Sequence, residues 1–345
     1  MKKTPTRRTL IGGVAAAALV LGLAACGDSN GDGNGDNGAG GDDGRNGGGS
    51  DFPTQSIDFI LPSSPGGSTD LIGRAMGQAL EEPLGAQITP VNRAGANGAV
   101  GGKEAFNQDP DGYTIVMMFQ SLLAITPLAV EDPDPIQFEH MDVLGTLTIE
   151  DYVMVVNADE TDAQTFEELI AQDDLSFGTA GLGTGGQLSQ ALLLGEAGVE
   201  YRDVPMDGGA PAVTALLGGQ VDAISVQVAE AAPHIEEGTF TPLLTFNEER
   251  SEYLPDVPSA VESGYDVVVD QKRFLAAPAG LPDDVLQKYR DAIAEASDDE
   301  QYSTFLEDNY ISKWEADPED VPGLMQDAAA DFEAKLDEFG ITLGG

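Results

Sequence analysis

Short apolar segments alternate with helical stripes along most of this chain, and that alternation limits its fold more than any other feature. Residues 57–61 form an apolar run of strand length, and residues 68–84 carry apolar side chains at helical spacing. Because strands that alternate with helices assemble into a parallel sheet covered by helices, the pattern predicts an α/β fold with a mainly parallel sheet. Further strands are expected at 87–91, 113–119, 152–157, 175–179, 201–204, 221–226, 241–246 and 273–277.

Helices are expected between these strands and at the C-terminal end of the chain. The spacing of apolar residues predicts helices over 187–197, 209–217 and 228–237. Pro282 can open another helix, because proline is favoured in the first helical turn. Apolar residues recur at helical spacing from Val321 to Phe339, directly before Gly340. The C-terminal region is therefore predicted to be helical.

The first 25 residues are typical of a signal peptide. Four basic residues precede an apolar stretch over 10–25 that is too short for an ordinary membrane span. The ending Leu23-Ala24-Ala25-Cys26 resembles the lipobox of bacterial lipoproteins, in which the cysteine is lipidated and becomes the mature N-terminus. We therefore predict a lipid anchor at Cys26, the chain's single cysteine; an ordinary signal peptide with an incidental cysteine is the alternative. Arg7 and Arg8 leave general and twin-arginine export equally open.

Residues 26–50 are predicted to be a flexible linker between this anchor and a folded body. They consist almost entirely of Gly, Asp and Asn and contain no large apolar side chain. Such a segment cannot bury enough apolar surface to offset the entropy lost on ordering. The expected location is extracytoplasmic, either lipid-anchored on the outer face of the cell membrane or periplasmic.

The strongly acidic composition restricts the possible partners. The chain carries 60 acidic residues against 16 Lys and Arg, for a formal net charge of −44. Because nucleic-acid binding needs a basic surface, this charge excludes nucleic acid as a partner. An acidic, halophilic-type surface is suited to high salt, where screening weakens the self-repulsion. The charge indicates where the protein works and leaves open what it does.

Two glycine-rich turns each join a predicted strand to a predicted helix. They read PSSPGGSTD over 62–70 and TAGLGTGGQ over 179–187. Glycine lets the backbone approach a ligand closely, and the free N–H groups at a helix start attract anions without any lysine. In open α/β sheets, ligands bind beside the carboxyl ends of strands, where such turns lie. The pair of turns therefore favours a shared binding site, although either alone could be a well-capped tight turn.

The second turn also contains the spacing of a dinucleotide-binding fingerprint, which makes an NAD-type oxidoreductase the main rival interpretation. Gly181, Gly183 and Gly186 match G-x-G-x-x-G, and Asp203 follows near the expected place of a ribose-binding acid. No nucleophile-elbow or P-loop motif accompanies it, and neither of the two histidines has metal-ligand spacing. We predict no enzymatic activity, no cofactor and no metal.

A series of motifs resembles one family over almost the whole body. It is similar to the substrate-binding proteins of tripartite tricarboxylate transporters, also called Bug receptors. The matching segments are PGGSTDLIGR (65–74), NRAGANGAVG (92–101), DGYT (111–114), the glycine loop at 181–186, GGAPA (208–212), LLGGQVD (216–222), LPDVP (254–258), ESGY (262–265), Arg273 and APAGLP (277–282).

This resemblance implies a two-domain, periplasmic-binding-protein-like fold, or Venus flytrap, that closes on a small carboxylate and passes it to membrane subunits. The chain is expected to cross between domains near 152–157 and just before Arg273. Domain one would then comprise 51–153 plus 273–345, and domain two 154–272. A monomer is expected, and a membrane sensor could replace the transporter as the partner.

The resemblance also implies which residues bind the ligand. Family members hold a carboxylate with backbone N–H groups, hydroxyls and bound water from the two glycine-rich loops. Asp70 is expected to brace its loop, because two negative charges in contact repel each other. The residues implied are Ser64, Gly66, Gly67, Ser68, Thr69 and Asp70 in domain one, Gly183, Thr184, Gly185 and Gly186 in domain two, and Ser121 and Ser225 as weaker rim candidates.

Two departures from the family pattern bear on the ligand. The family often has His at the position of Gln187, and Tyr-Lys-Gly where this chain has Met206-Asp207-Gly208. An acid in place of a lysine disfavours a second ligand carboxylate and suits an amino group or a hydroxyl. A monocarboxylate or an amino-acid-like ligand is one hypothesis; Asp207 as one more surface acid is the other.

Overall fold

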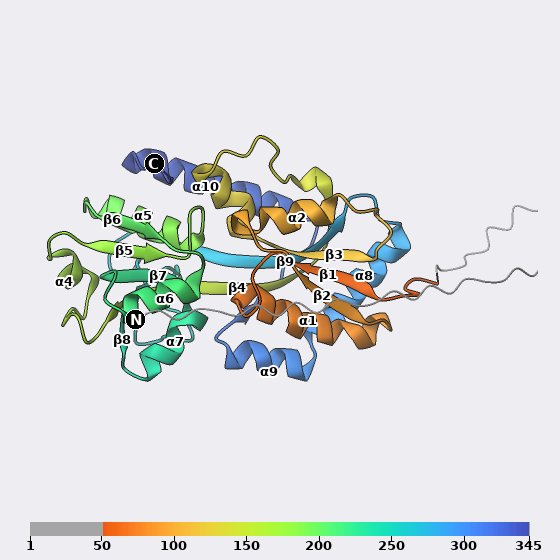
Figure 1. The fold of residues 1–345 in the computed structure, drawn as a ribbon, viewed down its shortest axis with the longest axis horizontal. Helices are drawn as coiled ribbons and strands as arrows, with labels where there is room; N and C mark the ends of the chain where they lie inside the picture. The colour runs from red at the N-terminus through yellow and green to blue at the C-terminus, as the bar shows by residue number, and fades with distance from the viewer. Residues whose placement is uncertain (1–50, 345) are drawn as a thin grey trace, which may run out of the picture. The chain divides into compact units, whose positions relative to one another are not determined.

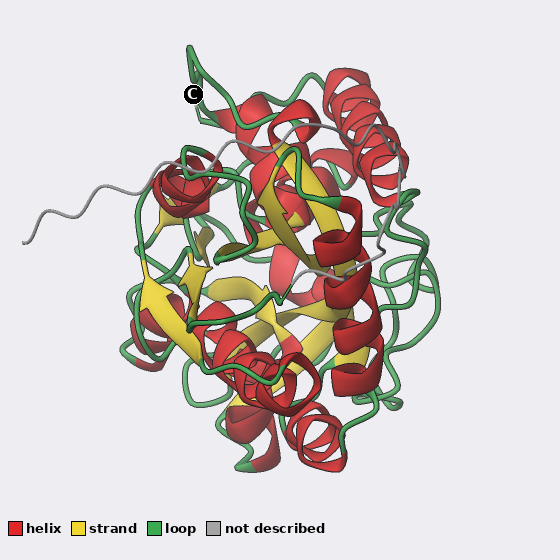
Figure 2. Cartoon of the chain, turned by 90° about the vertical axis from the view of Figure 1, so that its right-hand side faces the viewer, coloured by secondary structure: helices red, strands yellow, loops and turns green. Residues whose placement is uncertain are grey.

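A computed structural model describes residues 51–344 of the chain. Three sequence-based predictions lie outside the described residues: the signal peptide, the lipidation site Cys26 and the linker over 26–50. The described part is an α/β structure whose strands form two groups, and helices surround the strands (Figure 2). No helix within residues 51–344 combines the length and the apolar character needed to cross a membrane.

The first strand group is built around three parallel strands. β1 (Ile57–Leu61) pairs on one side with β2 (Ile88–Asn92) and on the other with β3 (Thr114–Phe119). The long strand β9 (Asp270–Pro278) runs antiparallel beside β3, and β10 (Ser312–Lys313) pairs with β4.

The second strand group has the same parallel arrangement at its centre. β5 (Ser176–Thr179) lies between β6 (Arg202–Pro205) and β7 (Ala223–Gln227), and all three are parallel. β8 (Phe240–Thr245) is antiparallel to the strand that links the two groups.

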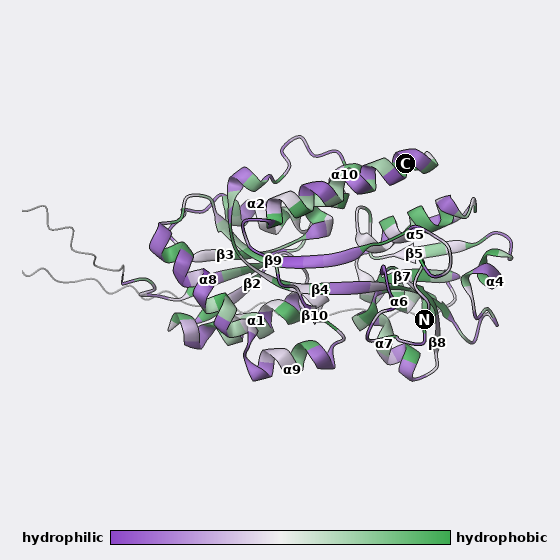
Figure 3. Ribbon diagram, turned by 180° about the vertical axis from the view of Figure 1, so that it is seen from behind, coloured by the Kyte–Doolittle hydropathy of each residue, from purple (hydrophilic) through white to green (hydrophobic). Residues whose placement is uncertain are grey.

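The linking strand is β4 (Met141–Asn157), which belongs to both groups (Figure 1). It pairs with β9 as far as Asp151, opposite Asp270, and from Tyr152 onward it pairs with β7 and β8. Figure 3 shows hydrophilic stretches on β4 and β9 along this course. The point where β4 changes partners is therefore a place where polar side chains enter an otherwise apolar sheet.

Helices α1 (Ser68–Leu84), α8 (Asp283–Ser297) and α9 (Glu300–Asp308) pack on the apolar core of the first strand group. Helices α5 (Gly185–Glu196) and α6 (Gly209–Leu217) pack beside β7 in the second strand group. In α1, the fully buried Ile72, Met76 and Leu80 form the apolar stripe, and Gly85 ends the helix in a left-handed conformation. The helices are α1 (Ser68–Leu84), α2 (Ala99–Phe106), α3 (Thr126–Ala129), α4 (Phe166–Ile170), α5 (Gly185–Glu196), α6 (Gly209–Leu217), α7 (Val228–Glu236), α8 (Asp283–Ser297), α9 (Glu300–Asp308) and α10 (Val321–Phe339), with short turns of helix at Ala96–Gly98, Ser121–Ile125 and Phe138–His140.

The α/β fold is confirmed, and the bounds of β1, α1, α6 and α10 agree with the sequence-based prediction. The expectation of a mainly parallel sheet is corrected, because β4 and β9 run antiparallel to their neighbours and make the sheet mixed. The sequence analysis also missed the first half of β4, over 141–151, where polar residues interrupt the apolar pattern. The predicted domain boundaries remain a prediction; α10 packs on both cores, through Val321 and Met325 on one and Phe332 and Leu336 on the other.

Candidate functional site

The turn between β1 and α1 is held in shape by Asp70. Its Oδ2 accepts a hydrogen bond from the Gly66 N–H at 2.8 Å, and its Oδ1 accepts from Arg74 Nε at 2.9 Å and Asn92 Nδ2 at 2.8 Å. Burial alone would raise the pKa of the Asp70 carboxyl, but these hydrogen bonds outweigh burial and lower it. Asp70 is therefore an ionised brace for the loop, and its oxygens are already occupied.

The N-terminus of α1 leaves backbone donors free. The N-cap residue Gly67 offers no side chain to cap the helix, and the first backbone hydrogen bond runs from Leu71 N–H to the Gly67 carbonyl. The N–H groups of Ser68, Thr69 and Asp70 consequently have no acceptor among residues 51–344. Together with the helix dipole, these three donors form an anion-binding geometry at the carboxyl end of β1.

The turn between β5 and α5 is tied together by side chains. Thr184 Oγ1 donates to the Gly181 carbonyl at 2.8 Å and accepts from the Gln187 N–H at 3.3 Å. Gln187 Oε1 in turn accepts from the Gly183 N–H, and its Nε2 donates to Asp203 Oδ2 at 2.7 Å. In the part of the chain that the structure describes, no acceptor reaches the N–H groups of Gly185 and Gly186. This loop is thus a second, pre-organised set of backbone donors.

Glycine is required in this second loop because other backbone and ring atoms lie against it. A Cβ at Gly185 would lie 2.5 Å from Tyr152 Cε2, and one at Gly186 would overlap the Ser225 carbonyl oxygen. Gly183 has φ +69°, and a Cβ there would lie 2.7 Å from the Cα of Thr126. The sequence therefore fixes how closely α5 approaches β4 and β7.

Residues of the first strand group also hold the second loop. Asn97 Nδ2 donates to the Gly183 carbonyl at 3.1 Å and to Thr126 Oγ1 at 2.8 Å, and Thr126 Oγ1 lies 3.2 Å from the same carbonyl. These side chains come from the segments that follow β2 and β3. They tie the second glycine-rich loop to the first strand group.

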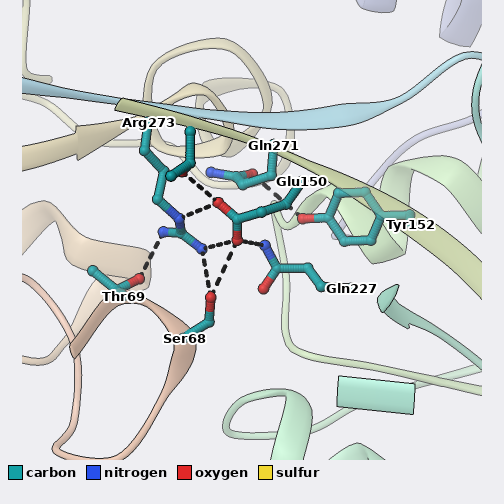
Figure 4. A network of polar contacts seen from close by, with 8 residues as sticks. Ser68, Thr69, Glu150, Tyr152, Gln227, Gln271 and Arg273 are labelled. Carbon is teal, nitrogen blue, oxygen red and sulfur yellow. Dashed lines mark hydrogen bonds and ion pairs between the residues drawn. The ribbon is translucent and has the colours of Figure 1, made fainter. Parts of the chain in front are cut away.

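A buried ion pair lies beside the first loop (Figure 4). Arg273 Nε and Nη2 donate to the two oxygens of Glu150 at 2.6 and 2.9 Å, and both side chains are almost fully buried. Glu150 Oε2 also accepts from Ser68 Oγ at 3.1 Å and from Gln227 Nε2 at 2.5 Å. Arg273 Nη1 donates to Thr69 Oγ1 at 2.7 Å. The pair thus connects the start of α1 with the N-cap of α7.

Both helix N-termini adjoin the same short stretch of β4 and β7. Glu150 and Tyr152 lie two residues apart on β4, and Tyr152 donates from its hydroxyl to Gln271 Oε1 at 3.3 Å, beside the ion pair (Figure 4). Ser225 and Gln227 are likewise two residues apart on β7. One member of each couple lies against α5 and the other belongs to the Arg273 network, so this stretch of β4 and β7 adjoins both helix N-termini.

A second acid, Glu230, lies at the start of α7. Burial raises the pKa of its carboxyl to about 7, against the opposing effects of a hydrogen bond from the Gln227 backbone and of the Arg273 charge. Its carboxylate also lies against Gly209 at the start of α6, where a Cβ would overlap both oxygens. Among the ion pairs of the described residues, none involves Glu230.

We expect Glu230→Gln to stabilise the protein at pH 8 and to have much less effect at pH 5. The folded state holds the Glu230 proton more tightly than the unfolded state, so stability falls as pH rises from about 4.5 to 7. Removing the acid should raise the free energy of unfolding by about 1–3 kcal/mol at pH 8 and by less than about 1 kcal/mol at pH 5. Urea unfolding at both pH values measures this, with Glu237→Gln at the exposed end of α7 as the control. Equal effects of the two substitutions at pH 8 would contradict it.

The remaining predicted residues lie near these loops with different degrees of access. Ser64 lies in the first turn, where its carbonyl accepts from the Gly67 N–H. Ser121 is buried after β3, and Ser225 is fully buried within β7 with no partner for its hydroxyl among the described residues. The binding roles of all the predicted residues, from Ser64 to Ser225, remain proposals.

Asp203, the acid that the dinucleotide interpretation expects to bind a ribose, is already hydrogen-bonded within the protein. Asp203 Oδ2 accepts from Gln187 Nε2, and Asp203 Oδ1 accepts from Gln190 Nε2 at 3.1 Å. Both oxygens therefore hold α5 and its loop. This acid fixes the protein's own loop instead of being presented to a sugar.

Glu150, Tyr152 and Gln227 were not predicted as site residues from the sequence. Glu150 is a charged residue inside a strand, and strands that change partners can bury such residues only with a paired charge. A glutamate flanked by strand-forming residues was the available signal, and among so many acids it did not stand out. Tyr152 and Gln227 can be recognised as parts of the site only from their contacts with Gly185 and Glu150, respectively.

Comparisons with known proteins show that this is a two-domain, periplasmic-binding-protein-like fold. A family model described as "Tripartite tricarboxylate transporter family receptor" matches residues 72–341. A UPF0065 protein from Pseudomonas sp. strain P51 is 31% identical, over 71% of this chain and 74% of its own length. The solved periplasmic binding protein BugD has a TM-score of 0.76 at 23% identity, covering 84% of this chain and 99% of that one. MatC from Rhodopseudomonas palustris, solved with bound malate, has a TM-score of 0.75 at 25% identity, covering 83% and 100%.

Proposed function

Because this chain belongs to the tripartite tricarboxylate transporter family of receptors, which are extracytoplasmic solute-binding proteins, we propose that it captures a small carboxylate between its two domains and delivers it to the membrane subunits of such a transporter. Malate in the similar MatC structure supports a carboxylate ligand. The protein acts by binding alone, without catalysis, as a monomer. A lipid on Cys26 holds it to the outer face of the membrane.

The observation that carries this proposal is the pair of helix N-termini that keep free backbone N–H groups. The N–H groups of Ser68, Thr69 and Asp70 on α1, and of Gly185 and Gly186 on α5, have no acceptors within residues 51–344. Hydrogen bonds from such donors to a carboxylate are charge-assisted and need no arginine or lysine. They hold one carboxylate group from two sides, which also explains how binding would draw the domains together.

A thermal-shift screen in high salt tests this function. We expect one class of small carboxylates, among mono-, di- and tricarboxylates and amino acids, to raise the melting temperature. A ligand at one hundred times its dissociation constant should contribute about 2.7 kcal/mol, or roughly 5–10 °C for a protein of this size.

NAD serves as the discriminating probe in the same screen. A shift in melting temperature with NAD and none with any carboxylate would contradict the receptor function and favour the NAD-type oxidoreductase interpretation. Co-purification of the protein with large and small membrane subunits would support the transporter as partner, and co-purification with a membrane kinase would contradict it.

A further inference from the structure

Glu150 is bound by its surroundings in the way a carboxylate ligand would be. Its Oε1 accepts from Arg273 Nε at 2.6 Å and from Thr148 Oγ1 at 2.8 Å. Its Oε2 accepts from Arg273 Nη2, from Ser68 Oγ and from Gln227 Nε2 (Figure 4). Five donors thus surround a side chain that is only 1% exposed. The chain supplies this carboxylate itself, at the first turn of α1.

Arg273 has little capacity left for any other anion. Its Nε and Nη2 are directed to Glu150, its Nη1 donates to Thr69 Oγ1, and Nη2 also lies 3.3 Å from Ser68 Oγ. An arginine beside a loop that is proposed to bind a carboxylate would otherwise be a strong partner for a second ligand carboxylate. Glu150 occupies two of the hydrogen-bond donors of Arg273 and neutralises the arginine's charge.

The other charges near this pair add to the same effect. Glu230, on the first turn of α7, contributes a further acid with no Lys or Arg paired to it among the described residues. Glu150, Glu230 and Arg273 interact electrostatically, and above the Glu230 pKa of about 7 they give this region more negative than positive charge. A ligand with a second carboxylate would meet repulsion here with no free cation to offset it.

We propose that Glu150 is a specificity-determining residue, a carboxylate of the chain itself that occupies Arg273 and so restricts the ligand to a single carboxylate group. This inference rests on the proposed carboxylate-receptor function. It extends that function by naming the substrate class: monocarboxylates, including those with a hydroxyl or an amino group. Freed from Glu150, Arg273 becomes the binding partner for a second ligand carboxylate.

Matched ligand pairs test this proposal by calorimetric titration. Succinate differs from butyrate, and malate from 2-hydroxybutyrate, by a carboxylate in place of a methyl group. We expect the wild-type protein to bind the monocarboxylate of each pair at least as tightly as the dicarboxylate. Glu150→Gln should shift the dicarboxylate-to-monocarboxylate affinity ratio by about tenfold or more, the effect of one charge-assisted hydrogen bond. Glu237→Gln, which removes an exposed acid, should leave the ratio unchanged.

A wild-type preference for succinate and malate, or an unchanged ratio in Glu150→Gln, would overturn the proposal. If none of the four probes bound to either protein, the substrate class assigned here would fail; the carboxylate-receptor function would fail as well only if no carboxylate or amino acid shifted the melting temperature in the thermal-shift screen.

Chemical rescue tests the resident carboxylate without any ligand. Glu150→Ala removes the atoms of one acetate ion from beside Arg273. Sodium acetate, compared with equal sodium chloride, should therefore raise the melting temperature of Glu150→Ala by about 3–6 °C more than it raises that of the wild-type protein. The same response in both proteins would show that Arg273 does not hold a carboxylate at this place.

Discussion

Replacing Arg273 by methionine is expected to lower the free energy of unfolding by about 3–5 kcal/mol. The substitution keeps much of the side-chain volume but leaves the Glu150 carboxylate buried without its cation, and Glu150 is only 1% exposed. Ser68, Thr148 and Gln227 would still donate hydrogen bonds to it, yet three neutral donors do not replace a bidentate guanidinium. Urea unfolding at fixed high salt measures the change.

A double-mutant cycle with Glu150→Met separates the ion pair from simple packing. Because an apolar pair of similar volume avoids the desolvation of both charges, Glu150→Met with Arg273→Met should recover most of the lost stability. The exposed pair of Arg250 and Glu262 offers a control, and Arg250→Met should cost less than about 1 kcal/mol. A similarly small cost for Arg273→Met would show that the buried network does not depend on its charge.

Gly186→Ala is expected to weaken carboxylate binding by more than about a hundredfold. The added methyl group would overlap the Ser225 carbonyl oxygen, and that oxygen belongs to a central strand that cannot move aside. The N-terminus of α5 must then shift, and the N–H groups of Gly185 and Gly186 lose their alignment with the ligand. Two charge-assisted hydrogen bonds of about 1.5–3 kcal/mol each account for the size of the effect.

Gly323→Ala is the matched control for this substitution. It adds the same methyl group within α10, where no atom lies within 4 Å of the new Cβ. We expect unchanged ligand affinity and slightly higher stability, because alanine is favoured over glycine inside a helix. Ligand binding by Gly186→Ala with wild-type affinity would exclude α5 as a part of the binding site.

The local sequence signals were sufficient for the first loop. The run of apolar residues before Pro62, the glycines, and the helical stripe after Ser68 predicted β1 and α1 at the bounds that the structure has. The bracing role expected for Asp70 matches its contacts with the Gly66 N–H and Arg74. These features depend on residues close in the chain, so their pattern is visible without a fold.

The ion pair could not be predicted because it depends on contacts between distant parts of the chain. Glu150 and Arg273 are 123 residues apart and meet only because β4 and β9 pair in antiparallel register, with Thr148 opposite Arg273. The same holds for Asp203, whose sequence position suited a ribose-binding acid. The structure shows that Gln187 and Gln190 occupy it instead. The pairing register of the strands and the change of partners along β4 decide which distant side chains meet, and neither leaves a local sequence pattern.

The most direct test of the account is an amide NMR titration with the carboxylate that gives the largest thermal shift. A carboxylate held by free helix N-termini should move the N–H resonances of Ser68, Thr69, Gly185 and Gly186 strongly downfield, because these groups donate to it. Glycine-selective labelling restricts the spectrum to glycine N–H groups, which include the two on α5. Large shifts confined to the surface hollow beside Tyr201 and Ile341, with Gly185 and Gly186 unmoved, would contradict the proposed site.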